Sequence, residues 1–405
     1  MLHDISISRR AQKAARIATA TAFFLDGMTF ATWVSRIPAV QERLHLRNAT
    51  LGVALLMMSL GALLTMPLMG RLVARRGSRV GTVLAVAVFG AALPGPGVAT
   101  GVITLGLALF AAGVGFGAVN VAANAQAVAV ERRYGRPIMG SFHATFSFGG
   151  IVGAILGSLA AARAVPPVVH FAVVGMIVVV VAFLLGPVLI QDPPTAVPQA
   201  GQSHKGSVFL FLGIIAFCTS MGEGAMSDWS AVFLRQVSRS PASVAALGFA
   251  AFSVSMTLGR LLADRVTIAL GPAGIVRLGG LLAGTGLFVA MLLPAAATAL
   301  GGFALVGLGL SALIPTIFSA AGRVPGVAPS VAIATVATTG YFGFLSGPPL
   351  IGLSSEVVSL RWAVGLVVIA CGVAIALARH VGVQPVANDS MPVERHCTRV
   401  NAAAA

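Results

Sequence analysis

Two short stretches decide the fold, GRLVARRGSR at residues 70–79 and GRLLADR at residues 259–265. Each follows an apolar run of about twenty residues, the length that crosses a bilayer once as a helix. A second pair, WVSRIPAV at residues 33–40 and WSAVFLRQ at residues 229–236, recurs in the same way near the ends of two other apolar runs. Similar segments at matching positions of the two halves predict an internal duplication.

The composition indicates an integral membrane protein. Hydrophobic residues make up 57% of the 405 residues and charged residues 9%, with a mean hydropathy of +0.96. Soluble domains carry roughly 25% charged residues. The net charge of +15 does not indicate nucleic-acid binding, because no basic stripe is interleaved with aromatic residues. The three cysteines follow neither a metal-binding spacing nor a disulfide framework. We expect a lipid bilayer as the environment and no nucleic acid as a partner.

The apolar runs predict an all-α membrane fold with twelve transmembrane helices in two parallel six-helix repeats. Backbone groups inside a bilayer must be satisfied within the segment, which leaves helices as the assignment for these runs. The predicted spans are residues 16–39, 49–69, 80–98, 102–126, 140–163, 168–190, 207–235, 242–262, 274–294, 297–320, 329–353 and 361–379.

The arginines and lysines predict the orientation. With the N-terminus in the cytoplasm, 19 of the 26 basic residues fall on the cytoplasmic side. This bias follows the positive-inside rule and predicts a multi-pass protein of the bacterial inner membrane with both termini cytoplasmic. The expected order is a cytoplasmic segment (1–15), a six-helix bundle (16–190), a proline-rich cytoplasmic linker (191–206), a second six-helix bundle (207–379) and a disordered cytoplasmic tail (380–405).

The segment at residues 70–79 resembles the cytoplasmic signature of the major facilitator superfamily, and the likeness extends over about residues 16–380. In that family the loop latches the cytoplasmic gate through an Asp, whose position here is Ala74. The second copy keeps the carboxylate as Asp264. The resemblance therefore implies a gating or structural role for Gly70, Arg75, Arg76, Gly77, Arg260, Asp264 and Arg265.

A narrower resemblance, to the MosC/YbjJ-like branch related to fucose-permease-type sugar–proton symporters, is carried by residues 120–150, 223–234 and 340–352. The proton-linked Asp of the fucose permease matches Val34, which cannot titrate. Its acidic residue in span four matches Asn120, and its sugar-binding Gln in span five matches His143. The resemblance implies a partly polar pocket with different proton chemistry.

Charged residues inside spans face a cavity or a partner, since a charge at mid-bilayer costs from about 3 to more than 10 kcal/mol. Asp26 and Trp33 lie seven residues apart and share one helix face. We expect both to bind substrate, with the ring stacking on the ligand, and Asp26 to be a second candidate for proton coupling. The alternative is an Asp26 that pairs with Arg36 and holds the bundle together.

Span seven carries two carboxylates in EGAMSDW, residues 223–229. Glu223 and Asp228 are about 140° apart around a helix, so both face one cavity only if the helix is broken there. The two glycines and the serine make a break plausible. We expect Glu223 to couple transport to protons, and Asp228, Trp229 and Arg36 to serve gating or structure.

The remaining polar candidates for substrate binding are amide, imidazole and phenol groups. Asn120 and Asn124 share a face of span four and suit a polyol, or they hydrogen-bond neighbouring helices. His143 carries a proton, binds substrate or caps span five. Tyr341 is the only tyrosine at depth in the predicted spans.

These features predict a secondary active transporter that moves a small polar organic solute, sugar-like or amino-sugar-like, by alternating access with proton coupling. Proton-antiport efflux of drugs or metabolites is the alternative. A carrier fold that senses without transport is disfavoured by the three surviving intramembrane carboxylates. No nucleophile–base pair or metal-ligand spacing indicates an enzyme. We expect protons and a small molecule as partners, no cofactor, no metal and a monomer.

Overall fold

The computed structural model describes residues 9–134, 138–191, 207–324, 327 and 329–381. The predicted linker and nearly all of the predicted tail lie outside this range. The first predicted segment, residues 1–15, overlaps the first helix, which begins at Arg9.

The first half of the described chain is helical from end to end, apart from short turns. Its helices are α1 (Arg9–Val34), α2 (Ile37–Arg43), α3 (Asn48–Arg76), α4 (Ser78–Ala92), α5 (Gly95–Val98), α6 (Val102–Tyr134), α7 (Met139–Ala162) and α8 (Pro167–Leu185).

The second half is built in the same way. Its helices are α9 (Ser207–Gln236), α10 (Ala242–Ala245), α11 (Gly248–Leu292), α12 (Ala296–Leu310), α13 (Leu313–Ala321), α14 (Pro329–Ala363), α15 (Gly365–Leu377) and the 3₁₀ helix η1 (Ala378–Val381). Two of these runs contain a break. Gly271 (φ 70°) interrupts α11 and Ser359 (φ 67°) interrupts α14, where the sequence predicts boundaries between spans.

The all-helical membrane fold is confirmed. Ten described helical segments are long and apolar enough to cross a membrane, or up to eleven if a bent pair forms one span. The bent pair consists of Thr335–Ala363 and Gly365–Val381, which meet at 76°. The predicted count of twelve therefore exceeds what length and composition support in the described chain, and it stays a prediction.

Small residues set how closely the helices pack. A Cβ atom built on Gly113 would collide with the backbone of Met58, and one built on Gly117 would lie 2.5 Å from the carbonyl oxygen of Ala62. These glycines, one turn apart on α6, let it lie directly against α3. Close approach of this kind is how membrane helices associate without a hydrophobic driving force.

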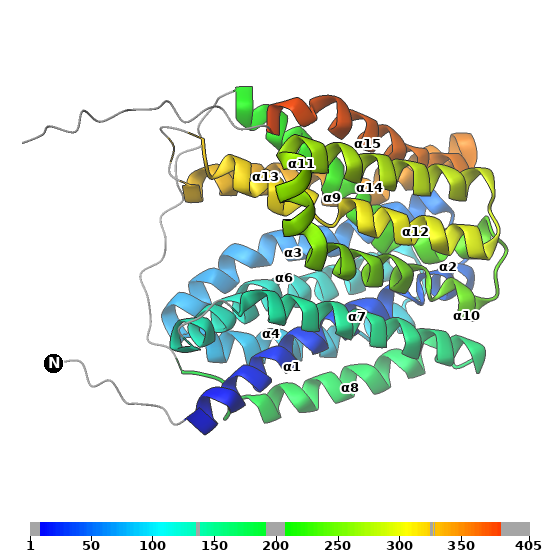
Figure 1. Ribbon diagram of the computed structural model, residues 1–405. Helices are drawn as coiled ribbons and strands as arrows, with labels where there is room; N and C mark the ends of the chain where they lie inside the picture. Colours follow the sequence, from blue (N-terminus) through cyan, green and yellow to red (C-terminus); the bar gives the residue numbers. More distant parts are fainter. Residues whose placement is uncertain (1–8, 135–137, 192–206, 325–326, 328, 382–405) are drawn as a thin grey trace, which may run out of the picture.

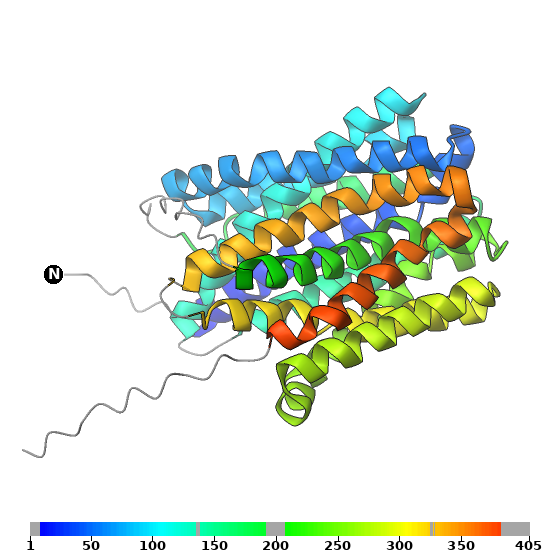
Figure 2. The same cartoon turned by 90° about the horizontal axis from the view of Figure 1, so that it is seen from above.

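The helices form two bundles that lie side by side, α1–α8 and α9–η1 (Figures 1 and 2). The main contacts between the bundles are made by α3 with α14 and by α7 with α10 and α11. The start of α1 and the end of α15 lie at one end of the molecule, which we term the terminal end (Figure 1). Helices α2 and α10 lie at the opposite end, the distal end (Figure 1).

Candidate functional site

A cavity of about 410 Å³ lies between the two halves at mid-length of the helices. Helices α1, α3 and α6 of the first half and α9, α13 and α14 of the second half supply its walls. Most of the lining is apolar and includes Phe30, Phe116, Phe318 and Phe344. The polar lining residues are Ser59, Asn120, Ser220, Glu223, Asp228 and Tyr341. Apolar walls with a few convergent polar groups are typical of small-molecule sites.

Both carboxylates of α9 line this cavity, although the helix is not broken. The expected discontinuity at Gly222 and Gly224 is wrong, because α9 is continuous from Ser207 to Gln236. The glycines serve packing: a Cβ on Gly224 would lie 3.3 Å from Phe344 of α14. Glu223 shares a stripe of α9 with Ser220 and Ala216, whereas Asp228 reaches the cavity from the flank and is buried. The cavity thus touches α9 along more than one face.

The cavity wall lacks a cationic side chain among the residues that the structure describes. Arg260 of α11 places a positive charge near Glu223 and near His143 of α7. Arg260 therefore lies near groups of both halves, a position that its place in the GRLLADR motif does not by itself predict.

Tyr341 joins the halves at the depth of the cavity. Its hydroxyl donates a hydrogen bond of 3.0 Å to the backbone carbonyl of Ser59 on α3. The sequence marks Tyr341 as a pocket residue, and the structure places it in the cavity wall. Ser59 and Ser220 were missed, because single serines in apolar helices carry no distinguishing pattern.

The two asparagines of α6 separate in the structure. Asn120 lines the cavity, while the Asn124 side chain donates a 2.6 Å hydrogen bond to the backbone carbonyl of Asn120. His143 lies outside the cavity wall, with an exposed side chain edge-on to Phe23 at 5.4 Å. The structure therefore does not gather Asn120, Asn124 and His143 around one ligand position.

The predicted pair on α1 also points elsewhere. The ring of Trp33 is buried and packs against Phe171 of α8, at 6.1 Å between centroids. Asp26, on the same face, is buried, and one of its carboxylate oxygens has no hydrogen-bond partner among the described residues. Phe30, a turn away, is the α1 residue that lines the cavity. The geometry thus does not bring Asp26 and Trp33 together around a ligand in this cavity.

The structural alternative for Asp26, a pair with Arg36, is not formed either. Arg36 donates a 2.7 Å hydrogen bond to the carbonyl of Val165. Trp229 is fully buried, and its indole nitrogen has no hydrogen-bond partner in the described chain.

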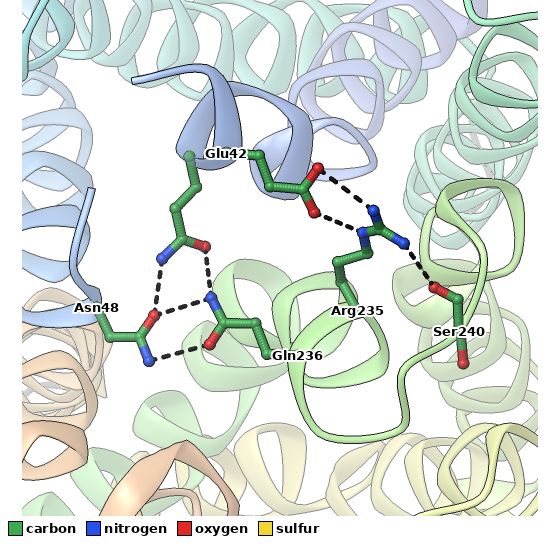
Figure 3. A network of polar contacts seen from close by, with 6 residues as sticks. Glu42, Asn48, Arg235, Gln236 and Ser240 are labelled. Carbon is green, nitrogen blue, oxygen red and sulfur yellow. Dashed lines mark hydrogen bonds and ion pairs between the residues drawn. The ribbon is translucent and has the colours of Figure 1, made fainter. Parts of the chain in front are cut away.

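Polar contacts hold the halves together at the distal end (Figure 3). Arg235 of α9 forms an ion pair with Glu42 of α2, and its Nη1 donates to the carbonyl of Ser240. The Gln236 amide donates to Gln41 and to Asn48, at 3.0 and 3.1 Å. Sequence reasoning missed these partners, because they come from segments far apart in the chain.

A second contact group closes the same end. Arg47 forms an ion pair with Glu356 of α14, whose other carboxylate oxygen accepts a hydrogen bond from the backbone N–H of Ala49 at 3.2 Å. Beside it, a Cβ on Gly52 would lie 2.6 Å from the carbonyl oxygen of Pro348. Within the described chain, the hydrogen bonds and ion pairs between the halves lie at this end or at Tyr341.

The motif residues predicted to gate lie at the terminal end. Gly77 (φ 84°) links α3 to α4 in a conformation that favours glycine. Arg75, Arg76 and Arg265 are exposed, and they make no ion pair with the residues that the structure describes. Gly70 lies in α3, six residues before its end, and Arg260 lies in α11. The side chain of Asp264 is outside the described part of the structure.

Comparison with known proteins identifies the family. Residues 19–331 match the Major Facilitator Superfamily. An uncharacterized MFS-type transporter of Yersinia pestis is 35% identical over 373 residues, covering 90% of this chain and 95% of that protein. The membrane protein MosC of Rhizobium meliloti is 35% identical over 375 residues, covering 91% of each chain.

A solved structure shares the fold. It is a bacterial homologue of the human lysosomal transporter Spinster in an inward-facing, unoccupied conformation. It superposes with a TM-score of 0.75 at 16% identity, over 94% of this chain and 100% of that one. The two helical bundles, the cavity between them and the sequence relatives lead to one conclusion: this chain belongs to the major facilitator superfamily of membrane transporters.

Proposed function

We propose that the protein is a proton-coupled secondary transporter for a small polar solute that carries a basic nitrogen, such as an amino sugar. The observation that carries the proposal is the cavity between the halves, which presents Glu223 and Asp228 and no cationic side chain within the described chain. A carboxylate in an apolar surrounding attracts an ammonium group strongly, and aromatic faces add cation–π attraction.

Polar groups on both sides of the cavity support a polyol body for this solute. Asn120 and Ser59 come from the first half, and Ser220 and Tyr341 from the second. Amide and hydroxyl groups both donate and accept hydrogen bonds, as sugar hydroxyls require. A solute held between the halves contacts both, so its binding can favour closure around it.

Alternating access is supported by the asymmetry of the contacts between the halves. The ion pairs of Arg47 and Arg235 cross between the halves at the distal end. The basic side chains Arg10, Lys13, Arg75, Arg76 and Arg132 gather at the terminal end. By the positive-inside rule this end faces the cytoplasm, so the conformation is closed toward the outside.

Efflux of larger cationic compounds by proton antiport is the second candidate. The four phenylalanines of the cavity wall favour it, because aromatic faces accommodate apolar cations.

The test is uptake of glucosamine, fucose and a cationic dye into proteoliposomes under an imposed pH gradient. The proposal predicts that glucosamine is accumulated, that fucose is not, and that Glu223→Gln abolishes accumulation. Transport of the dye alone supports the efflux candidate. Accumulation of fucose that survives Glu223→Gln contradicts both the basic nitrogen and the coupling role.

A further inference from the structure

Arg36 is a buried cation without a counter-ion in the described chain. Its side chain lies at the turn between α1 and α2 and is 5% exposed. Only Nη2 has a partner, the carbonyl of Val165, while Nε and Nη1 are buried without a hydrogen-bond partner among the described residues. A guanidinium stays charged at every physiological pH, and burying it unpaired is costly.

The Arg36 side chain forms part of the wall of a second cavity, of about 230 Å³, that shares no lining residue with the central one. The turn between α7 and α8 contributes Val165 and Pro166, and the second half contributes Arg235 and Ala242. The cavity therefore lies at the distal end, where the two halves meet.

The charges around this cavity favour an anion. Arg235 and Glu42 both line it and form an ion pair with each other, which leaves the charge of Arg36 unbalanced. The cavity also includes Pro167, the first residue of the 19-residue helix α8. The first turn of a helix carries partial positive charge and favours anions.

We propose that this cavity binds a small oxyanion, a carboxylate or a phosphate group, through the guanidinium of Arg36. Adjacent N–H groups on one edge of a guanidinium, Nε with Nη2 or Nη1 with Nη2, match the two oxygens of such a group, and Nη2 has a second N–H besides the one donated to Val165. Because both halves line the cavity, the bound anion stabilises the conformation closed at the distal end. The inference does not depend on which solute the central cavity transports.

The test measures anion-dependent thermal stability of the purified, delipidated full-length protein at constant ionic strength. Inorganic phosphate and acetate are the probes, against a chloride background. We expect either probe to raise the unfolding temperature of the wild type, because a ligand that binds only the folded state stabilises it. Arg36→Gln should weaken the apparent affinity at least about tenfold, as expected for loss of charge-assisted hydrogen bonds.

Two further variants keep the test decisive. Arg163→Gln removes an exposed arginine at the same end and should leave the anion response intact. Glu42→Gln removes the competing carboxylate and should tighten anion binding, which a purely structural role of Arg36 does not predict. This variant also serves if Arg36→Gln does not fold.

Native mass spectrometry before delipidation separates the two sources of the anion. A phospholipid adduct that is present in the wild type and lost in Arg36→Gln assigns the site to a lipid head group. If no adduct is present but phosphate or acetate raises the unfolding temperature, the site binds a free anion. If neither probe shifts the unfolding temperature and no adduct is present, the proposal is overturned. An equal response in wild type and Arg36→Gln also overturns it.

Discussion

The contact of α3 with α14 predicts how one added methyl group would shift the conformational equilibrium. The Cβ of a Gly52→Ala variant would lie 2.6 Å from the carbonyl oxygen of Pro348 and 3.2 Å from the Cα of Gly352. Ordinary van der Waals contact begins near 3.4 Å, so the two helices must separate by about 0.8 Å. Overpacking of this kind costs about 1–3 kcal/mol.

This cost falls on the conformation closed at the distal end, because the proposed alternating-access cycle requires α3 and α14 to move apart there. A cost of about 1–3 kcal/mol changes the population ratio by about 5- to 150-fold. Gly372→Ala is the matched control, because a Cβ at this glycine of α15 meets nothing within 4 Å.

The assay is pulsed electron–electron resonance between spin labels on Thr100→Cys and Ala297→Cys, in a background without the native cysteines. These exposed positions lie at the distal end, one in each half. We expect Gly52→Ala to populate longer label distances and Gly372→Ala to match the parent. An unchanged distance distribution in Gly52→Ala would refute the reasoning that this crossing holds the distal end shut.

Three further predictions follow from single contacts. Tyr341→Phe removes the hydrogen bond to Ser59 and should weaken the closed conformation by about 1 kcal/mol, seen as a smaller shift in the same label distances. Glu131→Ala removes the acceptor of the Ile138 and Met139 backbone N–H groups at the start of α7. The free energy of unfolding should fall by about 1–3 kcal/mol, seen as a lower denaturation midpoint, and an unchanged midpoint would contradict this prediction. Trp33→Phe should lower stability but leave the KM for transport unchanged, because its ring packs against α8, and a raised KM would return this residue to the substrate site.

The fold was predictable because the bilayer restricts the choices. Long apolar runs must be helices, and the repeated motifs at residues 70–79 and 259–265 place them in two matching halves. Even the breaks inside α11 and α14 fall where the sequence separates spans. Length and composition give ten or eleven spans in the described chain instead of twelve, because α15 is short and joins α14 at a sharp bend.

The cavity was predictable only in part. Glu223, Asp228, Asn120 and Tyr341 were singled out as polar groups at depth, and all four line it. Trp33 was also singled out, but which face of α1 meets the cavity depends on how α1 packs against its neighbours. One sequence does not encode that packing as a pattern, so residues on one stripe can end up in different surroundings.

The contacts at the distal end were not predictable for a related reason. Glu42 lies in the short helix α2 and Arg235 in the last turn of α9, at helix ends where a solvated side chain is the usual outcome. Their pairing depends on the docking of the two bundles, and the two residues lie 193 positions apart in the sequence. No periodicity marks such a pair in advance.

We propose that the solute binds in the cavity between the halves, beside Glu223. The most direct test places a single cysteine at Ser220, one turn from Glu223, and measures glucosamine transport after reaction with a small charged thiol reagent. Ser141→Cys, exposed at the start of α7, is the control for labelling outside the cavity. We expect modification of the cysteine at position 220 to abolish transport and glucosamine to slow this modification. Modification of the cysteine at position 141 should leave transport intact and should not be slowed by glucosamine. Full transport by the protein modified at position 220 would contradict the proposal.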